Sequence, residues 1–483
     1  MRQLDTRVTV VGAGAAGLYV ALCVARDGAR VNLVSAMPLA GSSSYWAQGG
    51  LAAALAGDDS PELHFADTVA AGRGMVRESA ARILATEAPA AVEDLARLGL
   101  RFDADRHRRL ALGLEGGHSV RRIVHAGGAA TGRRLIRELS ALVAKDDRIE
   151  ILEGRRATAV LTDAGRAVGL ELDGGERIGA AAVVLATGGA AALWSRTTNP
   201  AGATGSGLLL AHRAGAALAD LEMLQFHPTA VATPNGANGF LVTEAIRGEG
   251  ARLLDHLGER FVDELAPRDE VARAIARRML ETDWPSVDLD MRQVDPALFP
   301  NVVTALRRAG IDPERELVPV APAAHYMMGG IATDLDGRAS LPGLYAVGEC
   351  SCTGLHGANR LASNSLTECF VFGRRSAMAA LDEPAPRTSA EHATGGSGPP
   401  PPLTEESRDA LWRYAGLERD GEGLRILAGD PYPLVRLIAS SALERTESRG
   451  AHQRRDFPER DPKLDNRHVT TVADQPPVLV DWH

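Results

Sequence analysis

The order of apolar, small and polar residues predicts a strand, a helix and a second strand near the start of the chain. Val8, Val10 and Val11 form a short apolar run, residues 18–26 have the composition of an apolar helix, and residues 31–34 form a second run. Short β-branched runs between turn residues are typical of strands buried in a parallel sheet. The pattern therefore predicts a βαβ unit, around which we expect the rest of the chain to be organised.

The turn between the first strand and the helix reads Gly12-Ala13-Gly14-Ala15-Ala16-Gly17. One glycine permits the sharp bend, one lets a pyrophosphate approach the backbone, and one lets the helix pack on the strand. The diphosphate would rest on the helix N-terminus, where unpaired N–H groups favour negative charge. The second strand ends in Ser35-Ala36, without the acidic residue that is typical of nicotinamide sites. This disfavours a nicotinamide cofactor and leaves a flavin dinucleotide open.

The spacing of apolar residues predicts further helices and strands along the chain. It predicts helices over 62–70, 78–98, 133–143, 208–216 and 269–280, and strands over 149–152, 157–162, 167–172 and 180–186. Strands 157–162 and 167–172 are expected to form a hairpin with Asp173-Gly174-Gly175 as its turn. Residues 285–315 show little beyond a helical period and prolines. From Leu221 polar groups gather on short turns, and the small-residue pattern returns after Ala324.

These shifts divide the chain into domains. Residues 1–220 and 325–381 are predicted to form one discontinuous domain, and 221–324 a domain inserted into it. Residues 382–402 include Gly395-Gly-Ser-Gly and four consecutive prolines, so they are predicted to be a flexible linker with too little apolar surface to order. Residues 403–483 are predicted to be a C-terminal helical domain with a polar, loop-like tail from Arg449. The predicted class is α/β.

Composition excludes several classes of protein. A chain of 483 residues allows roughly three domains of ~150 residues, and 45% hydrophobic with 24% charged residues is ordinary for a globular protein. The net charge of −9, with no basic tail, argues against nucleic acid. No signal peptide and no apolar run of about 20 residues is present, so no membrane is expected. Cys23, Cys350, Cys352 and Cys369 lack metal or disulfide spacing, which predicts no metal and a cytoplasmic location.

Four glycine-rich segments, 12–17, 41–50, 187–189 and 348–366, indicate one extended cofactor lying across the sheet. The polar residues on turns are mostly cationic or imidazole side chains: His227, Arg247, Arg268, His325, His356 and Arg360. Arginine binds carboxylates through two parallel hydrogen bonds, so such a cluster beside a flavin suits a dicarboxylate. Taken singly, each of these residues is more often a surface or capping residue.

Several motifs in one order carry a resemblance to a known family. Besides the glycine turn they are Ala47-Gln-Gly-Gly, Gln225-Phe-His-Pro-Thr, Thr243-Glu-Ala-x-Arg-Gly-Glu-Gly, Ala266-Pro-Arg-Asp and His356-Gly-Ala-Asn-Arg-Leu-Ala-Ser-Asn-Ser-Leu. Together they resemble the succinate dehydrogenase/fumarate reductase flavoprotein family, from about residue 5 to about residue 380. The resemblance resumes at Arg445-Thr-Glu-Ser-Arg-Gly-Ala-His-Gln-Arg-Arg-Asp-Phe-Pro458.

The resemblance implies a Rossmann-like FAD-binding domain, an inserted α+β capping domain and a C-terminal helical domain. It implies FAD contacts at Gly12, Ala13, Gly14, Ala15, Ala16 and Gly17, at Ser43, Ser44, Tyr45, Trp46, Ala47, Gln48, Gly49 and Gly50, and at Glu349, Ser365 and Leu366. It implies Arg268 as proton donor and acceptor, with Glu244 and Arg247 as its relay. It places Gln225, His227, Thr243, His325 and Arg360 around the two substrate carboxylates.

Within the family, Glu115-Gly-Gly-His-Ser is similar to the members that oxidise L-aspartate to iminosuccinate, the first step of de novo NAD biosynthesis. The resemblance then implies Glu115 as counter-ion of the substrate ammonium, oxygen or fumarate as electron acceptor, and quinolinate synthase as the enzyme that receives the product. Members that bind FAD covalently have histidine where Ser43 stands, so non-covalent FAD is expected. Two positions differ from the family's pattern. The family's Thr-Gly-Asp-Gly is Thr204-Gly-Ser206-Gly here, and Ala36 stands where the members that oxidise L-aspartate often have lysine.

Two other interpretations stay open at this stage. A soluble fumarate reductase or the flavoprotein subunit of a membrane succinate dehydrogenase would share most of these motifs, although Ser43 and Glu115 argue against the subunit. A flavin-fold protein that has lost catalysis and serves as a binding module is disfavoured, because His227, Arg268 and the other candidate ligands of the carboxylates are present together.

Overall fold

The computed structural model describes residues 7–38, 41–232, 239–386, 390–395, 400–473 and 475–482. Its centre is a five-stranded parallel sheet in the order β17-β10-β1-β2-β6. The strands are β1 (Val8–Val11), β2 (Val31–Ser35), β6 (Ile149–Glu153), β10 (Ala182–Leu185) and β17 (Leu344–Ala346). All residues of β1, β2, β10 and β17 are buried, as expected for a parallel sheet covered on both faces.

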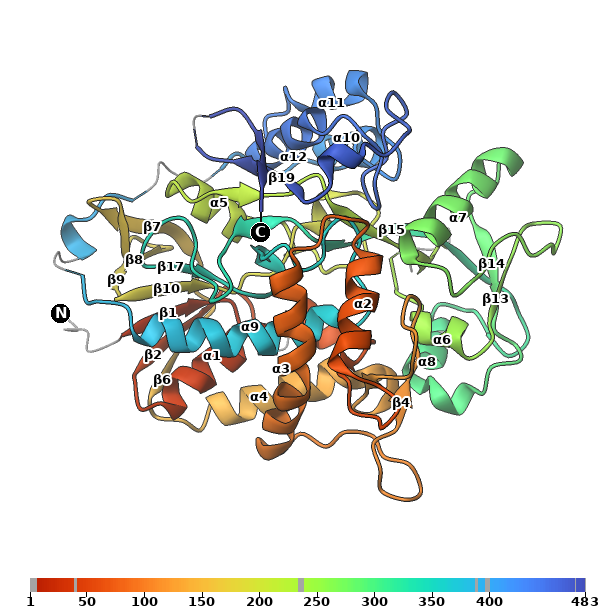
Figure 1. Cartoon of the computed structure of the whole chain (residues 1–483), viewed down its shortest axis with the longest axis horizontal. Coiled ribbons are helices and arrows are strands. Elements are labelled where there is room, and N and C mark those ends of the chain that lie inside the picture. The colour runs from red at the N-terminus through yellow and green to blue at the C-terminus, as the bar shows by residue number, and fades with distance from the viewer. Residues whose placement is uncertain are drawn as a thin grey trace.

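Helices cover one face of this sheet (Figure 1). They are α1 (Ala15–Arg26), α4 (Thr131–Val143) and α9 (Asn364–Leu381), with α2 (Pro61–Ala71) and α3 (Glu78–Arg97) standing side by side across them. The predicted βαβ unit is confirmed, but α1 begins at Ala15 because the extended Gly14 is already its N-cap. A small antiparallel sheet of β3 (Leu51–Ala52), β5 (Ile123–Val124) and β4 (Leu112–Gly113) lies beside them.

The opposite face carries an antiparallel sheet of β7 (Ala157–Asp163), β8 (Arg166–Leu172) and β9 (Arg177–Gly179). The predicted hairpin is present, but its turn was placed wrongly. Ala164 and Gly165, both in the left-handed region, connect β7 to β8, whereas Asp173-Gly174-Gly175 leads from β8 to β9. A strand of three residues such as β9 is too short to be detected by alternation.

Part of the predicted linker packs on this sheet. Ala393 is buried against Leu161 and Val168, and Thr394 exchanges two backbone hydrogen bonds with Thr162 of β7. The prediction that this stretch cannot order was therefore wrong for residues 390–395, because backbone pairing at a sheet edge replaces the missing apolar contacts. Residues 387–389 and 396–399 of the predicted linker lie outside the described residues.

The inserted segment forms a second sheet in the order β12-β15-β14-β13. The strands are β12 (Leu224–Val231), β13 (Arg252–Leu254), β14 (Val287–Asp290) and β15 (Val318–Met327), accompanied by α6 (Glu244–Gly248), α7 (Arg268–Thr282) and α8 (Pro300–Arg308). These elements share their own core, which includes Ile275, Leu289 and Val320. β14 was missed because Val287 and Leu289 alternate with aspartates over only four residues. The predicted boundary after Ala324 falls inside β15.

The C-terminal part contains the predicted helices α10 (Glu405–Tyr414), α11 (Gly421–Leu427) and α12 (Pro433–Glu444). The tail is loop-like, as predicted, only as far as residue 466, apart from a short 3-10 turn over Pro462–Leu464. It forms β19 (Arg467–Thr471) and β20 (Val478–Asp481), which extend a sheet of β18 (Ser351–Cys352), β16 (Gly330–Ala332) and β11 (Leu218–Ala219) near α5 (Ser206–Arg213). Its polar side chains Arg449, His452, Arg454 and His468 are buried and pair with other charged groups, so an apolar pattern cannot detect the segment.

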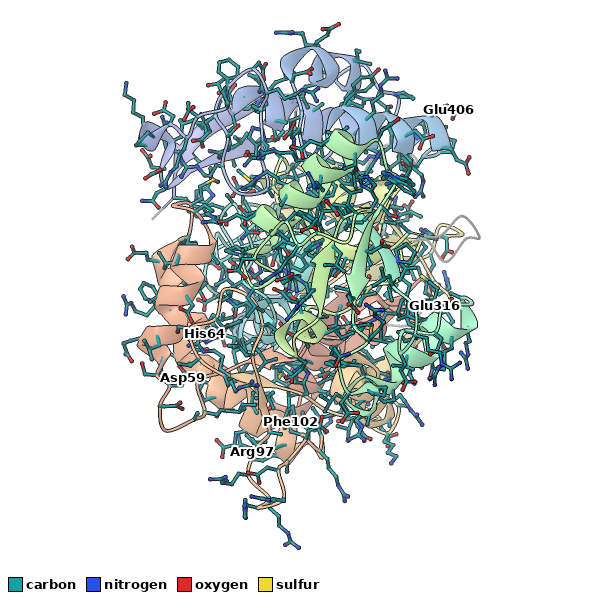
Figure 2. All side chains as sticks on the ribbon, turned by 90° about the vertical axis from the view of Figure 1, so that its right-hand side faces the viewer. Asp59, His64, Arg97, Phe102, Glu316 and Glu406 are labelled. Carbon is teal, nitrogen blue, oxygen red and sulfur yellow. The ribbon has the colours of Figure 1, made fainter. Side chains whose placement is uncertain are left out.

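Figure 2 views the molecule from the side of α7, with Glu406 of α10 at one end and Arg97 of α3 at the other. Across the part of the chain that the structure describes, every helix is too short or too polar to span a membrane. In the same part, histidine, cysteine, aspartate and glutamate side chains nowhere gather in threes that would hold a metal ion.

Candidate active site

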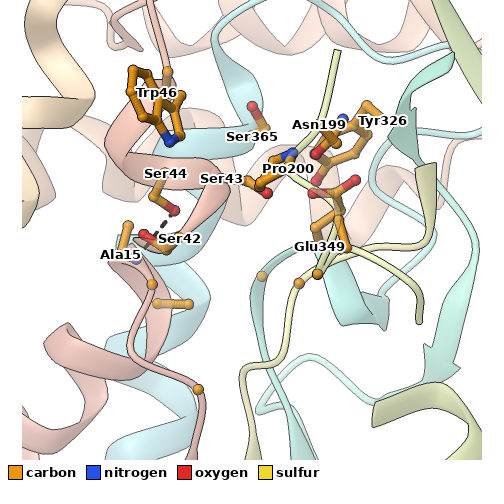
Figure 3. A pocket seen from close by; sticks show the side chains of 18 of the residues that line it. Ala15, Ser42, Ser43, Ser44, Trp46, Asn199, Pro200, Tyr326, Glu349 and Ser365 are labelled. Atoms are coloured by element: carbon orange, nitrogen blue, oxygen red, sulfur yellow. Dashed lines mark hydrogen bonds between the residues drawn. The ribbon is translucent and has the colours of Figure 1, made fainter. Parts of the chain in front are cut away.

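One cavity of about 670 Å³ is lined by residues around the five-stranded sheet and by residues of the β12-β15-β14-β13 sheet, called the capping sheet below. All four glycine-rich segments contribute to its wall, through residues such as Gly14, Gly49, Gly188 and Gly348. Figure 3 shows the serines of the 41–50 loop on one side and Glu349 on the other. A cavity of this size and composition is typical of a cofactor site, so segments far apart in the sequence build one site.

The glycine turn forms one end of the cavity. A Cβ added to Gly12 would lie 2.2 Å from the Ala186 carbonyl oxygen, and one added to Gly17 would lie 1.8 Å from that of Gly12. Gly14 instead faces the cavity wall, with Ser44 Oγ at 3.3 Å from such a Cβ. The first amide of α1, Ala15 N–H, donates to Ser44 Oγ at 3.2 Å (Figure 3). The turn therefore opens the helix N-terminus to an anionic group.

Several polar atoms in the wall lack a partner. The hydroxyl oxygens of Ser42 and Thr187 and the amide oxygen of Gln48 are buried without a hydrogen bond to any described residue. All three residues line the cavity, and Gln48 is fixed because its Nε2 donates to the Leu241 carbonyl at 2.8 Å. Buried polar atoms in folded proteins normally have partners. These atoms, with the open helix N-terminus, fit a long polar cofactor such as FAD.

Glu349 lies in the wall opposite the serine loop (Figure 3). Its Oε1 accepts from Met327 N–H at 2.9 Å, and a Cβ added to Gly189 would lie 2.2 Å from the same oxygen. Burial raises the pKa of Glu349 to about 7, against the opposing effects of the Met327 amide and Arg360. Glu349 is thus a buried hydrogen-bonding group that faces the cavity.

Two guanidinium groups meet at one amide oxygen. Gln225 Oε1 accepts from Arg268 Nη1 at 3.3 Å and from Arg360 Nη2 at 3.1 Å. Gln225 Nε2 donates to Asn359 Oδ1 and to the Arg360 carbonyl, at 2.9 and 2.8 Å. Arg360 also donates to Ser365 Oγ at 2.7 Å. Burial and Arg268 lower the pKa of Arg360 to about 10, so two close, buried cations face the cavity and favour an anionic ligand.

Behind Arg268 lies a line of charged groups. Arg268 Nε donates to Glu244 Oε2 at 2.5 Å, and Arg247 Nη2 lies 3.6 Å from Glu244 Oε1. Burial alone would raise the pKa of Glu244, but Arg268 and Arg247 hold it below its usual value. Arg247 donates to the Glu264 carbonyl. The carboxylate of Glu244 is therefore ionised between two arginines.

Two histidines complete this end of the cavity. The rings of His227 and His325 lie 5.0 Å apart between centroids. His227 Nδ1 accepts from Thr229 N–H at 3.2 Å, so its proton is on Nε2, which has no partner among the described residues. Burial and the nearby Arg268 place the pKa of both histidines well below the usual range. They are neutral imidazoles, and His227 presents an unused donor.

Glu115 faces the same space from the first domain. Its Oε2 accepts from Ser363 Oγ at 2.7 Å, and Ser363 Oγ accepts from Gly50 N–H at 3.1 Å. The adjoining Gly116 N–H donates to Glu244 Oε1 at 3.0 Å. Glu115 is only 2% exposed, so a ligand that binds its carboxylate would do so with little surrounding water.

A buried ion-pair network supports the Glu115 loop. Arg122 Nε lies 2.9 Å from Asp59 and Arg122 Nη1 lies 2.6 Å from Asp67. His118 Nε2 lies 2.9 Å from the Ala362 carbonyl oxygen, and its Nδ1 lies 3.2 Å from Arg122 Nη1. Figure 2 shows Asp59 and nearby His64 together on the side of α2. The loop is thus anchored to α2 and to the segment that carries Ser363.

The structure brings together most, but not all, of the residues that the sequence analysis singled out. Gly17, Tyr45, Gln225 and Arg247 do not line the cavity, whereas the other predicted site residues do. Gly17 packs α1 on the turn, and the Tyr45 ring meets the Trp46 ring edge to face. Gln225 and Arg247 stand one layer behind the wall. His356 pairs with Glu368 at 2.9 Å, away from the cavity wall.

Three residues of the wall that were not predicted as site residues contact predicted ones. Ser363 holds Glu115, Thr198 Oγ1 lies 2.7 Å from His325 Nδ1, and the Tyr326 ring lies under the Arg360 guanidinium at 4.3 Å. Ser363 lies inside the motif that runs from His356 to Leu366, and Tyr326 directly follows His325. These positions in the sequence could have indicated that both residues belong to the site. Thr198 lies in a glycine-rich polar loop that carried no further pattern.

Two family models match most of the chain. A model described as "FAD binding domain" matches residues 7–366, and one described as "Fumarate reductase flavoprotein C-term" matches residues 431–480. The first covers the cavity, the glycine turn and the capping sheet. The second covers the C-terminal segment in which the sequence resemblance resumes.

Curated relatives and solved structures agree with these matches. The chain is 46% identical to an L-aspartate oxidase of Caulobacter vibrioides (97% of this chain, 96% of the relative) and 42% identical to one of Streptomyces coelicolor (96% and 90%). Solved structures of E. coli quinol fumarate reductase FrdA (TM-score 0.87, 28% identity, 99% and 97% covered) and Mycobacterium smegmatis Sdh1 (0.80, 30%, 98% and 93%) share the fold. The chain therefore belongs to the L-aspartate oxidases, within the succinate dehydrogenase/fumarate reductase family of FAD-binding flavoproteins.

Proposed function

We propose that this protein oxidises L-aspartate to iminosuccinate with FAD and passes the electrons to oxygen or fumarate. The proposal rests on one observation. Arg268 and Arg360 both donate to Gln225 Oε1 and both line the cavity, and Glu115 lines the same cavity. Two cations suit the two carboxylates of the substrate, and the single carboxylate suits its ammonium group. The relatives named L-aspartate oxidase support the same substrate.

FAD, when bound along the glycine-rich wall, supplies the hydride acceptor. The protein then has to orient the substrate and manage charge and protons. Arg360, His227, His325 and Thr243 would hold the carboxylates, since all four line the cavity and His227 offers a free Nε2–H. Glu115 would hold the ammonium, which fixes the Cα–H bond relative to the cofactor.

Arg268 is assigned as the proton donor and acceptor. Its guanidinium reaches the cavity on one side and bonds Glu244 on the other, while Arg247 contacts Glu244 from behind. Arginine is a poor base in water, but a proton leaving Arg268 stays within this buried relay. Gln225, outside the cavity wall, is assigned to holding both arginines rather than to the substrate itself.

The direct test uses the purified holoenzyme and L-aspartate. In air, peroxide should form in proportion to aspartate consumed, and without oxygen the flavin should bleach and then regain its colour on addition of fumarate. A soluble fumarate reductase would show the second reaction with an artificial reductant but no peroxide from L-aspartate. An inactive binding module would show neither reaction while remaining yellow.

We also propose where the protein acts. Iminosuccinate is consumed in the next step of NAD biosynthesis, so quinolinate synthase is the proposed recipient. All four cysteines are buried free thiols, which agrees with a reducing cytoplasm.

The proposed domains are the FAD-binding, capping and C-terminal domains with the bounds predicted above, although β15 crosses the boundary after Ala324.

FAD is expected to be released completely when the protein is precipitated with acid. The loop 41–50 has Ser43 and no histidine, so no imidazole is present there for a covalent link. The cavity thiol Cys369 is buried, which raises its pKa and keeps it protonated and unreactive. The measurement is the absorbance of the supernatant and of the washed pellet. Yellow colour that stays in the pellet would contradict the prediction.

The capping segment 221–324 is expected to exchange its amide hydrogens more slowly when a dicarboxylate binds. It supplies His227 and Arg268, whereas Arg360 and Glu115 come from the first domain, so a ligand held by both sides favours the closed arrangement. Hydrogen exchange with and without malonate, which cannot be oxidised here, measures the effect. Helices α10–α12 serve as the internal control, and equal exchange of 221–324 in both states would contradict closure.

A further inference from the structure

The first turn of α7, which carries Arg268, is tied to a distant part of the first domain. Asp269 Oδ1 lies 3.2 Å from Arg73 Nη2, and the Asp269 side chain is only 3% exposed. Arg73 belongs to the connection between α2 and α3, the orange arc at the top of those helices in Figure 1. Glu270 contacts the same guanidinium. Arg73 itself has φ +57°, a left-handed conformation that non-glycine residues rarely adopt.

The same turn of α7 is tied to the C-terminal segment. Arg273 Nη1 lies 3.3 Å from Asp269 Oδ2 and donates to the Gly450 carbonyl at 3.0 Å. Arg449 Nη1 donates to the Arg73 carbonyl at 2.8 Å. The contacts therefore close a ring that runs from Arg73 through Asp269 and Arg273 to residues 449–450 and back to Arg73.

The C-terminal side of this ring is held by further contacts. Arg449 is fully buried and makes two hydrogen bonds to Glu447, at 2.8 and 2.9 Å. Gly450 has φ +51°, and an added Cβ would lie 2.4 Å from the Ala358 carbonyl oxygen. Ala451 N–H donates to that same oxygen at 2.8 Å. Ala358 lies two residues before Arg360. The segment that carries Arg360 therefore also holds residues 450–451, which contact the first turn of α7 where Arg268 stands.

We propose that this ring, formed by Arg73, Asp269, Arg273 and residues 447–451, is a latch that positions Arg268 against a bound dicarboxylate. Asp269 does not line the cavity, so it acts through its neighbour and is a positioning residue. The latch rests on the proposed function, because it gains its purpose from proton transfer by Arg268. It also gives a role to the C-terminal motif from Arg445 to Pro458, which lies outside the cavity.

The charge of Asp269 is what makes the latch effective. The buried carboxylate of Asp269 lies between two guanidinium groups and accepts a charge-assisted hydrogen bond from each, at 3.2 Å from Arg73 and 3.3 Å from Arg273. Asparagine has the same size but no charge, and its amide group offers one acceptor atom instead of two. Loss of the latch lets the first turn of α7 shift, and a catalytic group displaced by about 1 Å can lose up to about 10²-fold in rate.

The experiment compares Asp269→Asn with Glu281→Gln in the holoenzyme. Glu281 lies at the other end of α7 and pairs with Arg278 at 3.3 Å in an exposed position, so it is a matched carboxylate outside the latch. Photoreduced enzyme is mixed with fumarate, and the rate of flavin reoxidation at saturation is measured. Malonate binding to the oxidised enzyme, FAD content and Tm are measured on the same preparations.

We expect Asp269→Asn to slow reoxidation by about 10- to 100-fold while malonate affinity and FAD content stay within about threefold of wild type. Glu281→Gln should match wild type. Arg73→Gln should slow the reaction similarly, because it breaks the Arg73–Asp269 contact from the other side. The double variant should be no slower than either single one, because either substitution already opens the ring. Additive losses, an unchanged rate in Asp269→Asn, or equal losses of rate, affinity and FAD would overturn the latch. A wild-type enzyme inactive with both L-aspartate and fumarate would overturn the proposed function as well.

Discussion

Replacing Arg268 by lysine is expected to lower kcat by at least about 10²-fold while the protein still folds and retains FAD. Arg268 uses Nε toward Glu244 at 2.5 Å and Nη1 toward Gln225 at 3.3 Å, and its guanidinium also reaches the cavity. A lysine ammonium is a single point of charge that cannot span these partners, and it loses its proton more readily. The substitution therefore removes the positioned proton donor and acceptor without removing the positive charge.

The measurement is kcat with L-aspartate and oxygen, and with fumarate and a reductant, on protein of known FAD content. Arg277→Lys is the matched control, because Arg277 is an exposed arginine of the same helix. A nearly normal kcat in Arg268→Lys would show that Arg268 only begins α7 beside Asp269 and Glu270. In that case the relay through Glu244 would have no catalytic role.

Glu115→Gln is expected to raise KM for L-aspartate by about 30- to 3,000-fold while fumarate reduction is unchanged or faster. L-Aspartate and fumarate share two carboxylates, but only L-aspartate has an ammonium group. In a desolvated site this charge needs a partner, and removal of one partner of such a pair commonly costs about 2–5 kcal/mol. Fumarate has no positive group and is repelled by the carboxylate of Glu115, so it gains from the loss. Glu115→Leu should act in the same direction.

The alternative is that Glu115 is a structural anchor. Its carboxylate accepts from Ser363, which in turn accepts from Gly50 N–H, so its loss would then disturb the loop around the cofactor. Both activities would fall together, along with FAD content and Tm. Ser363→Gly is the control, because it removes the hydroxyl while glycine tolerates the φ of +61° at this position. A pure anchor predicts equal defects in Ser363→Gly and Glu115→Gln, whereas an ammonium partner predicts a much larger aspartate KM in Glu115→Gln.

The amino-terminal βαβ unit shows how much of the fold the local sequence pattern predicts. Its apolar runs and glycine spacing predicted β1, α1 and β2 within a few residues, because buried parallel strands and a tight turn each need particular residue types. The strand β14 and the tail strands β19 and β20 were not predicted. β14 is a short alternating run, His468 of β19 is buried against Asp220, and the residues of β20 are mostly exposed. The pairing of such strands depends on partners that lie far away in the sequence.

The candidate site shows the same limit. Most of the residues that motif resemblance singled out line the cavity, but Gln225, which it assigned to the substrate carboxylates, does not. Only the structure separates a side chain that faces the ligand from one that holds its neighbour. The hydrogen bonds of Gln225 are all made to protein groups contributed by α7 and by residues 359–360, and a linear motif contains no such information.

The sequence by itself determined the dinucleotide turn, the flavoprotein family and the dicarboxylate chemistry, because each depends on residue types at fixed local spacing. It also predicted the role of Glu115. The tertiary structure alone decided which cations converge, which histidine nitrogen is free, and how the C-terminal segment reaches Asp269. Those features are distances between residues as much as 376 positions apart, such as Arg73 and Arg449. The chain acquires them only when sheets and helices pack together, since burial and charge pairing are properties of the folded surroundings.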